Sequence, residues 1–123
     1  MPKKILWVED DAFLNEIIAE KLVEQGWELI PAAEGVAALA LAHEKQPDII
    51  ILDILLPGMD GMEVLSKLKS DEGTKNIPII MFSNLDDKAK IEQSKKLGAK
   101  DFYVKATTDL ETIVKDIEKI IAN

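Results

Sequence analysis

The fold of this chain is decided by the stretch Ile49-Ile50-Ile51-Leu52-Asp53-Ile54-Leu55-Leu56-Pro57-Gly58-Met59-Asp60-Gly61. Residues 49–52 are apolar without polar alternation, which predicts a strand buried on both faces, as in the centre of a parallel sheet. Asp53 then lies at the carboxyl end of a central strand. Pro57 and Gly58 break the chain, and Asp60 with Glu63 predicts a capped start for the following helix.

Strands and helices alternate on both sides of this stretch. Strands are expected at residues 5–8, 27–30, 49–53, 77–82 and 101–104. Apolar residues at helical spacing predict helices near residues 14–22, 36–44, 62–68, 86–97 and 110–121. The helix at 86–97 has few apolar residues, so we expect it to be the least firmly held. Strict alternation predicts an α/β fold with a parallel sheet covered by helices on both faces.

Several residues predict where these elements begin and end. Gly26 and Gly98 follow helical segments and suit left-handed caps. Pro31 suits a strand at the edge of the sheet, because it cannot donate a backbone hydrogen bond. Thr108 and Glu111 have the spacing of a capping box for the last helix.

Composition limits the possible functions. The chain has 123 residues, a formal charge of −8 and no cysteine, which excludes disulfides and thiolate chemistry. The negative charge argues against nucleic-acid binding. The first strand begins at residue 5, too early for a signal peptide, and no apolar run approaches the ~20 residues of a membrane span. We expect one cytoplasmic domain over residues 1–123, with no output domain and no membrane partner.

Charged and hydroxyl side chains stand at four predicted strand ends, namely Glu9 with Asp10, Asp53, Ser83 and Lys105. The carboxyl ends of parallel strands share one edge of a sheet, so we expect these side chains to meet there. Three carboxylates repel one another, and a divalent cation relieves that repulsion. Oxygen-only ligands favour Mg²⁺ over zinc.

Metal, lysine and hydroxyl together stabilise a transferring phosphoryl group. The chain has no glycine-rich phosphate loop to hold a nucleotide. An aspartate can itself act as the nucleophile and form an acyl phosphate. Asp53, in the middle of the group, is the expected acceptor.

The chain resembles the response regulator receiver domains of two-component signalling over essentially its whole length, and is similar to single-domain chemotaxis regulators. This resemblance implies a (βα)5 flavodoxin-like, doubly wound sheet with strand order 2-1-3-4-5. The matching residues are Val8-Glu9-Asp10, the stretch from Asp53 to Gly61, Ser83, Gly98-Ala99 and Lys105.

The resemblance also implies roles for individual residues. Glu9, Asp10, Asp53 and the backbone carbonyl of Leu55 would hold Mg²⁺. Asp53 would receive a phosphoryl group from a sensor histidine kinase or a histidine phosphotransfer protein.

Three further roles concern the phosphorylated state. Ser83 and Lys105 would contact the phosphoryl oxygens, and Phe102 would be an aromatic switch residue. The surface formed by the fourth helix, the fifth strand and the fifth helix would change for a downstream protein partner. Such a chain is no enzyme with an external substrate but a phosphoacceptor that catalyses its own phosphorylation and dephosphorylation, as a monomer or a weak phosphorylation-dependent dimer.

Some residues depart from the family pattern. Ala106 follows Lys105 where the family usually has a proline in a cis peptide, and a cis Lys105–Ala106 bond would cost ~3–4 kcal/mol. We therefore expect either a trans bond with a reshaped loop or a strained cis bond. Asn84 replaces a usually small residue and would narrow access for the phosphodonor. Leu55 and Leu85 flank the expected phosphoryl site, at positions where polar residues can assist the attack of water on the phosphoryl group. We therefore predict slow self-dephosphorylation.

Simpler interpretations stay open for these residues. Asp53 could cap a turn, Glu9 and Asp10 could form a solvated loop before an Asp11 helix cap, and Phe102 could only pack. Two other functions also stay open. One is a phosphatase using an aspartyl phosphate, although Leu55 leaves it no second carboxylate as general acid. The other is a receiver-like binding module that works without phosphorylation.

Overall fold

The apolar run at residues 49–52 forms the central strand of a five-stranded parallel sheet, in a computed structural model that describes residues 2–122. The strand order is β2-β1-β3-β4-β5, and each neighbouring pair is parallel. This confirms the predicted fold class and order. The strands are β1 (Lys4–Val8), β2 (Glu28–Ala32), β3 (Ile49–Leu52), β4 (Ile79–Ser83) and β5 (Asp101–Val104).

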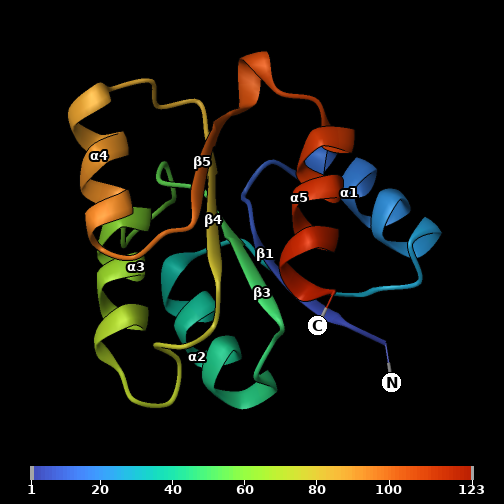
Figure 1. Cartoon of the computed structure of the whole chain (residues 1–123), viewed down its shortest axis with the longest axis horizontal. Coiled ribbons are helices and arrows are strands. Elements are labelled where there is room, and N and C mark those ends of the chain that lie inside the picture. Colours follow the sequence, from blue (N-terminus) through green and yellow to red (C-terminus); the bar gives the residue numbers. More distant parts are fainter. Residues whose placement is uncertain (1, 123) are drawn as a thin grey trace.

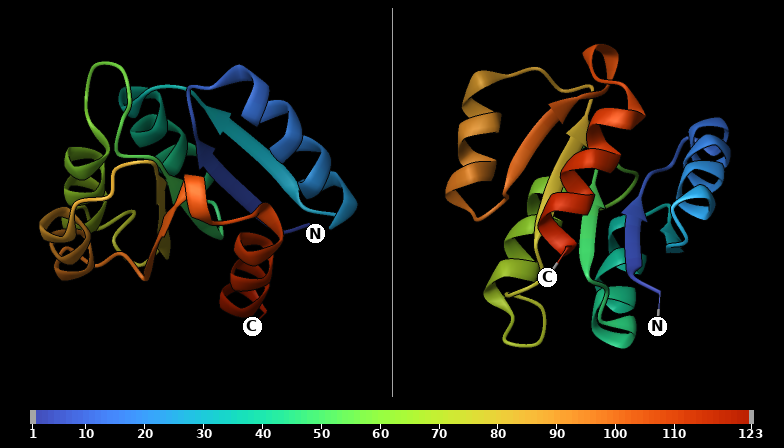
Figure 2. Two further views of the ribbon diagram at one scale, coloured as in Figure 1. Left: turned by 90° about the horizontal axis from the view of Figure 1, so that it is seen from above. Right: turned by 45° about the vertical axis from the view of Figure 1, so that its right-hand side comes forward.

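Helices cover both faces of the sheet, as the alternation of elements predicted. They are α1 (Ala12–Glu24), α2 (Gly35–Lys45), α3 (Gly61–Ser70), α4 (Lys88–Lys96) and α5 (Leu110–Ile121). Figure 1 shows α2, α3 and α4 on one face and α1 with α5 on the other. The strand arrows point the same way in the right-hand view of Figure 2, so the carboxyl ends of the strands share one edge. Within the described range, no helix combines the length and the apolar character that crossing a membrane requires.

Each face of the sheet has its own apolar core. Ile50 and Leu52 pack in the cluster under α2 and α3, whereas Ile49 and Ile51 pack in the cluster under α1 and α5. All four residues are fully buried, which confirms a strand covered on both sides. The sheet is therefore a rigid platform for the residues at its carboxyl edge.

Most predicted helix ends are confirmed, but one is wrong. Gly26 and Gly98 have φ values of 76° and 113°, in the left-handed region expected for these caps. The last helix is capped by Asp109, not Thr108. The Asp109 carboxylate accepts hydrogen bonds from the backbone amide and hydroxyl of Thr112, at 2.9 and 2.8 Å. A carboxylate one residue nearer the helix takes the capping position that the hydroxyl of Thr108 was expected to fill.

Other boundaries differ by one or two residues. β2 ends at Ala32 rather than Ile30, and it contains Pro31 at the sheet edge, as expected. The predicted start of β4 at Ile77 is too early, because Pro78 has no amide to donate and the ladder begins after it. α4 begins at Lys88, and Ser94 is the only residue within Lys88–Lys96 that is buried. That α4 is the least firmly held helix stays a prediction.

Candidate functional site

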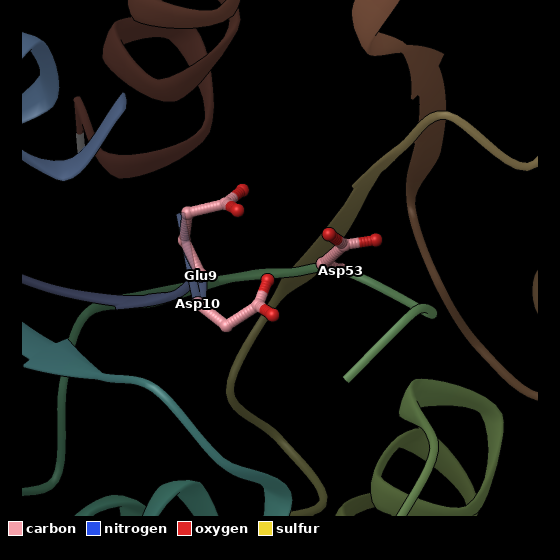
Figure 3. Close-up of side chains that lie close together, drawn as sticks. All are labelled: Glu9, Asp10 and Asp53. Atoms are coloured by element: carbon pink, nitrogen blue, oxygen red, sulfur yellow. The ribbon is translucent and has the colours of Figure 1, made fainter. Parts of the chain in front are cut away.

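The site begins where β1 and β3 end side by side. Val8 and Leu52 are partners in the ladder, so the residues that follow them are neighbours as well. The Asp53 amide donates to the Val8 carbonyl at 3.3 Å. Carboxylate oxygens of Glu9, Asp10 and Asp53 all lie within 4.8 Å of one another. Figure 3 shows Glu9 and Asp10 extending from the end of β1 toward the side on which Asp53 lies.

Lys105 supplies the positive charge of this group. It follows β5 directly, as the first residue of the 3-10 turn Lys105–Thr107, and its ammonium is mostly buried. Its Nζ donates to Asp53 Oδ2 at 2.6 Å and forms an ion pair with Glu9. Burial acts to lower the pKa of Lys105, but the hydrogen bonds and charges of Asp53 and Glu9 outweigh it and raise the pKa. Lys105 is therefore positively charged at neutral pH.

Glu9 is the most buried carboxylate of the three, with 1% of its surface exposed. Burial raises its pKa, against the opposing effects of the Lys105 ammonium and the Asp11 amide. Within residues 2–122, Glu9 Oε1 has no hydrogen bond of good geometry, although Lys105 lies within ion-pair distance. Three carboxylates carry more negative charge than Lys105 neutralises, and a set of oxygen ligands with excess negative charge fits a hard divalent cation such as Mg²⁺.

A cavity of about 630 Å³ opens over these residues. One wall comes from α1, a second from the end of β4 and a third from the turn after β5. Asp53 and Lys105 both line the cavity, so a small molecule can reach them from solvent. The lining residues outside the charged group include Phe13, Ile17, Leu55, Asn84, Ala106 and Leu110.

Ser83 and Phe102 lie farther from this cavity than the acidic residues. Ser83 ends β4 and is fully buried, and its hydroxyl accepts from the Leu85 amide at 3.3 Å. Asn84 lines the cavity, whereas Ser83 does not. Phe102 is partly buried and packs in the cluster on the α2, α3 and α4 face. The phosphoryl-contact role of Ser83 and the switch role of Phe102 stay predictions, as does the Leu55 carbonyl as a metal ligand.

The Lys105–Ala106 peptide is trans, since residues 2–122 contain no cis peptide bond. The chain turns through a single 3-10 turn before Thr108. This confirms the trans bond of the first expected outcome, and the reshaped loop stays a prediction.

Sequence reasoning missed two contacts that shape the site. The Asn15 side chain donates to the Glu9 carbonyl at 2.9 Å, a contact six residues apart that no motif signals. Gly61 backs directly onto the backbone at Asp53, because a Cβ at this position would lie 2.0 Å from the Asp53 carbonyl oxygen. Its place at the end of the Pro-Gly-Met-Asp-Gly segment was the available signal for that close approach.

Comparisons with known proteins show the fold and the family of this chain. Response regulator PleD of Caulobacter vibrioides is 38% identical over 110 residues, which are 89% of this chain and 24% of PleD. The chain thus spans about a quarter of that relative. The structure of chemotaxis protein CheY4 of Vibrio cholerae matches with a TM-score of 0.87 and 29% identity, covering 98% of this chain and 99% of that one.

A second solved structure, the phosphorylated cyanobacterial phytochrome response regulator RcpA, matches with a TM-score of 0.84 and 32% identity, over 100% of this chain and 96% of that one. The family model described as the response regulator receiver domain matches residues 5–118. The chain therefore belongs to the response regulator receiver domain family.

Proposed function

We propose that this receiver domain is a phosphorylation-activated switch in which Asp53 accepts a phosphoryl group from the phosphohistidine of a sensor histidine kinase or a histidine phosphotransfer protein. One observation carries the proposal: the Asp53 carboxylate, held by Lys105 at 2.6 Å, faces an open cavity within a cluster of three carboxylates. A nucleophile, a fixed positive charge and a metal-binding group thus share one site.

Two groups orient the Asp53 carboxylate for attack. The Leu55 amide donates to Oδ1 at 3.1 Å, and Lys105 donates to Oδ2. An oxygen of Asp53 forms a new bond to phosphorus while the bond from phosphorus to the donor's imidazole nitrogen breaks, and the imidazole leaves with the electron pair. Lys105 then exchanges part of its contact with the carboxylate for the new phosphoryl oxygens, which keeps the charge balanced.

The acidic residues at the end of β1 complete the site. Glu9 and Asp10, with Asp53 and the Leu55 carbonyl, would hold Mg²⁺, which neutralises negative charge on the phosphoryl oxygens when it is bound. Receiver domains bind this metal in their active site, and the donor set here fits it. Without the cation, the carboxylates of Asp10 and Asp53 would repel an incoming phosphoryl group.

Phosphorylation would be read on the surface formed by α4, β5 and α5. The pull of the phosphoryl group on Ser83, which ends β4, would change the packing of Phe102, which lies in the neighbouring strand β5. A loosely held α4 suits such a change. We infer a downstream protein partner, a cytoplasmic location, and a monomer or a weak phosphorylation-dependent dimer.

Acetyl phosphate tests this proposal without a kinase. The intact mass of the chain is measured after incubation with and without Mg²⁺, in the wild type and in Asp53→Asn. The proposal predicts one phosphoryl addition that requires both Mg²⁺ and Asp53. No addition to the folded wild type would favour a phosphorylation-independent binding module, and repeated turnover of a phosphomonoester would favour a phosphatase.

A further inference from the structure

Glu9 is fixed from several directions at once. Its backbone amide donates to the Ala32 carbonyl at 2.9 Å, and its Oε2 accepts from the Asp11 amide at 3.1 Å. Its carbonyl accepts from Nδ2 of Asn15 at 2.9 Å. The first two contacts hold the strand end and the side chain. The third holds the peptide plane that joins Glu9 to Asp10.

The position of the Asp10 carboxylate depends on this peptide plane more than the positions of the Glu9 and Asp53 carboxylates do. Among the described residues, its carboxylate makes no hydrogen bond or ion pair with another residue, and it is exposed, whereas Glu9 and Asp53 are both paired with Lys105. The backbone then fixes where the Cα–Cβ bond of Asp10 points, and this bond limits the positions that its carboxylate can reach. That backbone is fixed through the Glu9 carbonyl, and the side chain that holds this oxygen is Asn15, half-buried in the first turns of α1.

We propose that Asn15 is a positioning residue of the metal site: its amide locks the Glu9–Asp10 peptide and so aims the Asp10 carboxylate at the cation shared with Glu9 and Asp53. The inference rests on the proposed function, in which these carboxylates hold Mg²⁺. Outer contacts of this kind orient ligands before the cation arrives, and losing one costs roughly 10–100-fold in metal affinity. Asn15 touches neither the cation nor the phosphoryl group.

The test compares Mg²⁺ dissociation constants, measured by titration calorimetry with the metal alone, across three variants of Asn15. Asn15→Leu keeps the branching at Cγ but removes the donor, and Asn15→Ala removes the side chain beyond Cβ while favouring the helix. Both are expected to weaken Mg²⁺ binding about tenfold. Asn15→Gln keeps an amide donor and is expected to recover most of the affinity. Gln93→Ala, which removes an exposed amide from α4, is the matched control and is expected to bind as the wild type does.

A second measurement separates positioning from general support of α1. The rate of phosphorylation by acetyl phosphate at saturating Mg²⁺ is expected to stay within about twofold of the wild type in both donor-free variants, since the excess metal restores the site. Wild-type affinity in folded Asn15→Leu or Asn15→Ala would overturn the inference and leave the proposed function intact. The inference would also be overturned if the stability of these variants and their phosphorylation rate at saturating Mg²⁺ fell in step with the loss of Mg²⁺ affinity, because Asn15 would then only support α1. A wild type that neither binds Mg²⁺ nor becomes phosphorylated would instead overturn the proposed function.

Discussion

At the scale of single residues, the site is a balance between three carboxylates and one ammonium. Lys105 neutralises only part of the negative charge, and it contacts Glu9 and Asp53 but leaves Asp10 to solvent. The ion pairs that Lys105 forms with Glu9 and Asp53 hold the ammonium beside the Asp53 carboxylate, where the proposed phosphoryl transfer requires a positive charge. The remaining negative charge is what a divalent cation would neutralise.

Leu55 should make the phosphorylated state long-lived. Its side chain is 54% exposed and lines the cavity beside Asp53, where an apolar group cannot orient an attacking water. We expect Leu55→Gln to speed loss of the phosphoryl group by about tenfold, a modest share of the 10²–10⁴-fold that positioned acid-base groups provide. The decay is followed by intact mass after excess acetyl phosphate is removed.

Val23→Gln is the control for that change. Val23 is also an exposed apolar residue, 75% exposed on α1, but it does not line the cavity. Its variant should decay at the wild-type rate. A wild type that loses its phosphoryl group as fast as Leu55→Gln would contradict this explanation.

At the scale of elements, the start of α3 supports the end of β3 from behind. Gly61→Ala would place a Cβ 2.0 Å from the Asp53 carbonyl oxygen and 2.5 Å from the Ile54 Cα. Since backbone cannot move aside cheaply, we expect a loss of about 3 kcal/mol in the free energy of unfolding, measured by urea denaturation.

Gly58→Ala is the matched comparison in the same loop. Gly58 has φ of 74° and open space around it, so only the left-handed backbone opposes a side chain. Its cost should be about 1 kcal/mol. Equal losses in the two variants would show that the contact between Gly61 and Asp53 is not what matters.

The contact between β5 and α5 should depend on pH through Asp101. Burial, followed by the hydrogen bond and charge of Asp116, raises the pKa of Asp101. Tyr103 donates to the same Asp116 carboxylate at 2.7 Å. The folded state therefore holds this proton more tightly than the unfolded state. The resulting stability is complete below the usual Asp value of 3.8 and is lost as the pH rises through the folded pKa.

Asp101→Asn cannot lose that stability, because the amide is neutral throughout. We expect the variant to exceed the wild type in Tm by a few degrees at pH 7, and the difference to shrink as the pH falls below 4. Asp86→Asn, at an exposed position before α4, has the same change of charge and should show no such trend. A difference that grows on acidification would contradict the assigned direction.

Patterns along the chain predicted the elements better than their edges and contacts. The apolar runs of β1 and β3 and the cap of Asp60 depend on local residues, and they formed as expected. The cap at Asp109 was missed because Thr108 satisfies the same local rule one position earlier. The contact between Asn15 and Glu9 could not be predicted, since it depends on the angle between α1 and β1, which many packed residues set together.

At the scale of the whole molecule, the residues that stabilise the fold and the charged residues of the candidate site lie in different places. Two apolar cores bury both faces of the sheet, under the helices that Figure 1 shows on either side. The charged group lies where β1, β3 and β5 end. Repulsion among the unneutralised carboxylates lowers the stability of this fold. A cation bound among these carboxylates would relieve this repulsion and so raise the stability of the folded domain.

Magnesium should accordingly stabilise the folded domain. At ten times the dissociation constant, the free energy of unfolding should rise by about 1.4 kcal/mol, because the cation binds only the folded state. Thermal unfolding with MgCl₂, against NaCl of equal ionic strength, measures this gain. Asp10→Asn should lose most of it. An equal gain in that variant would place the cation elsewhere.

The most direct test of the central claim is to locate the phosphoryl group within the chain. After reaction with acetyl phosphate, borohydride converts an aspartyl phosphate to homoserine, and peptide mass analysis identifies the residue that has changed. We predict conversion at Asp53 alone, in the presence of Mg²⁺ and not in EDTA. Conversion at another carboxylate, or equal conversion at Asp53 in EDTA, would contradict a magnesium-dependent switch built around this residue.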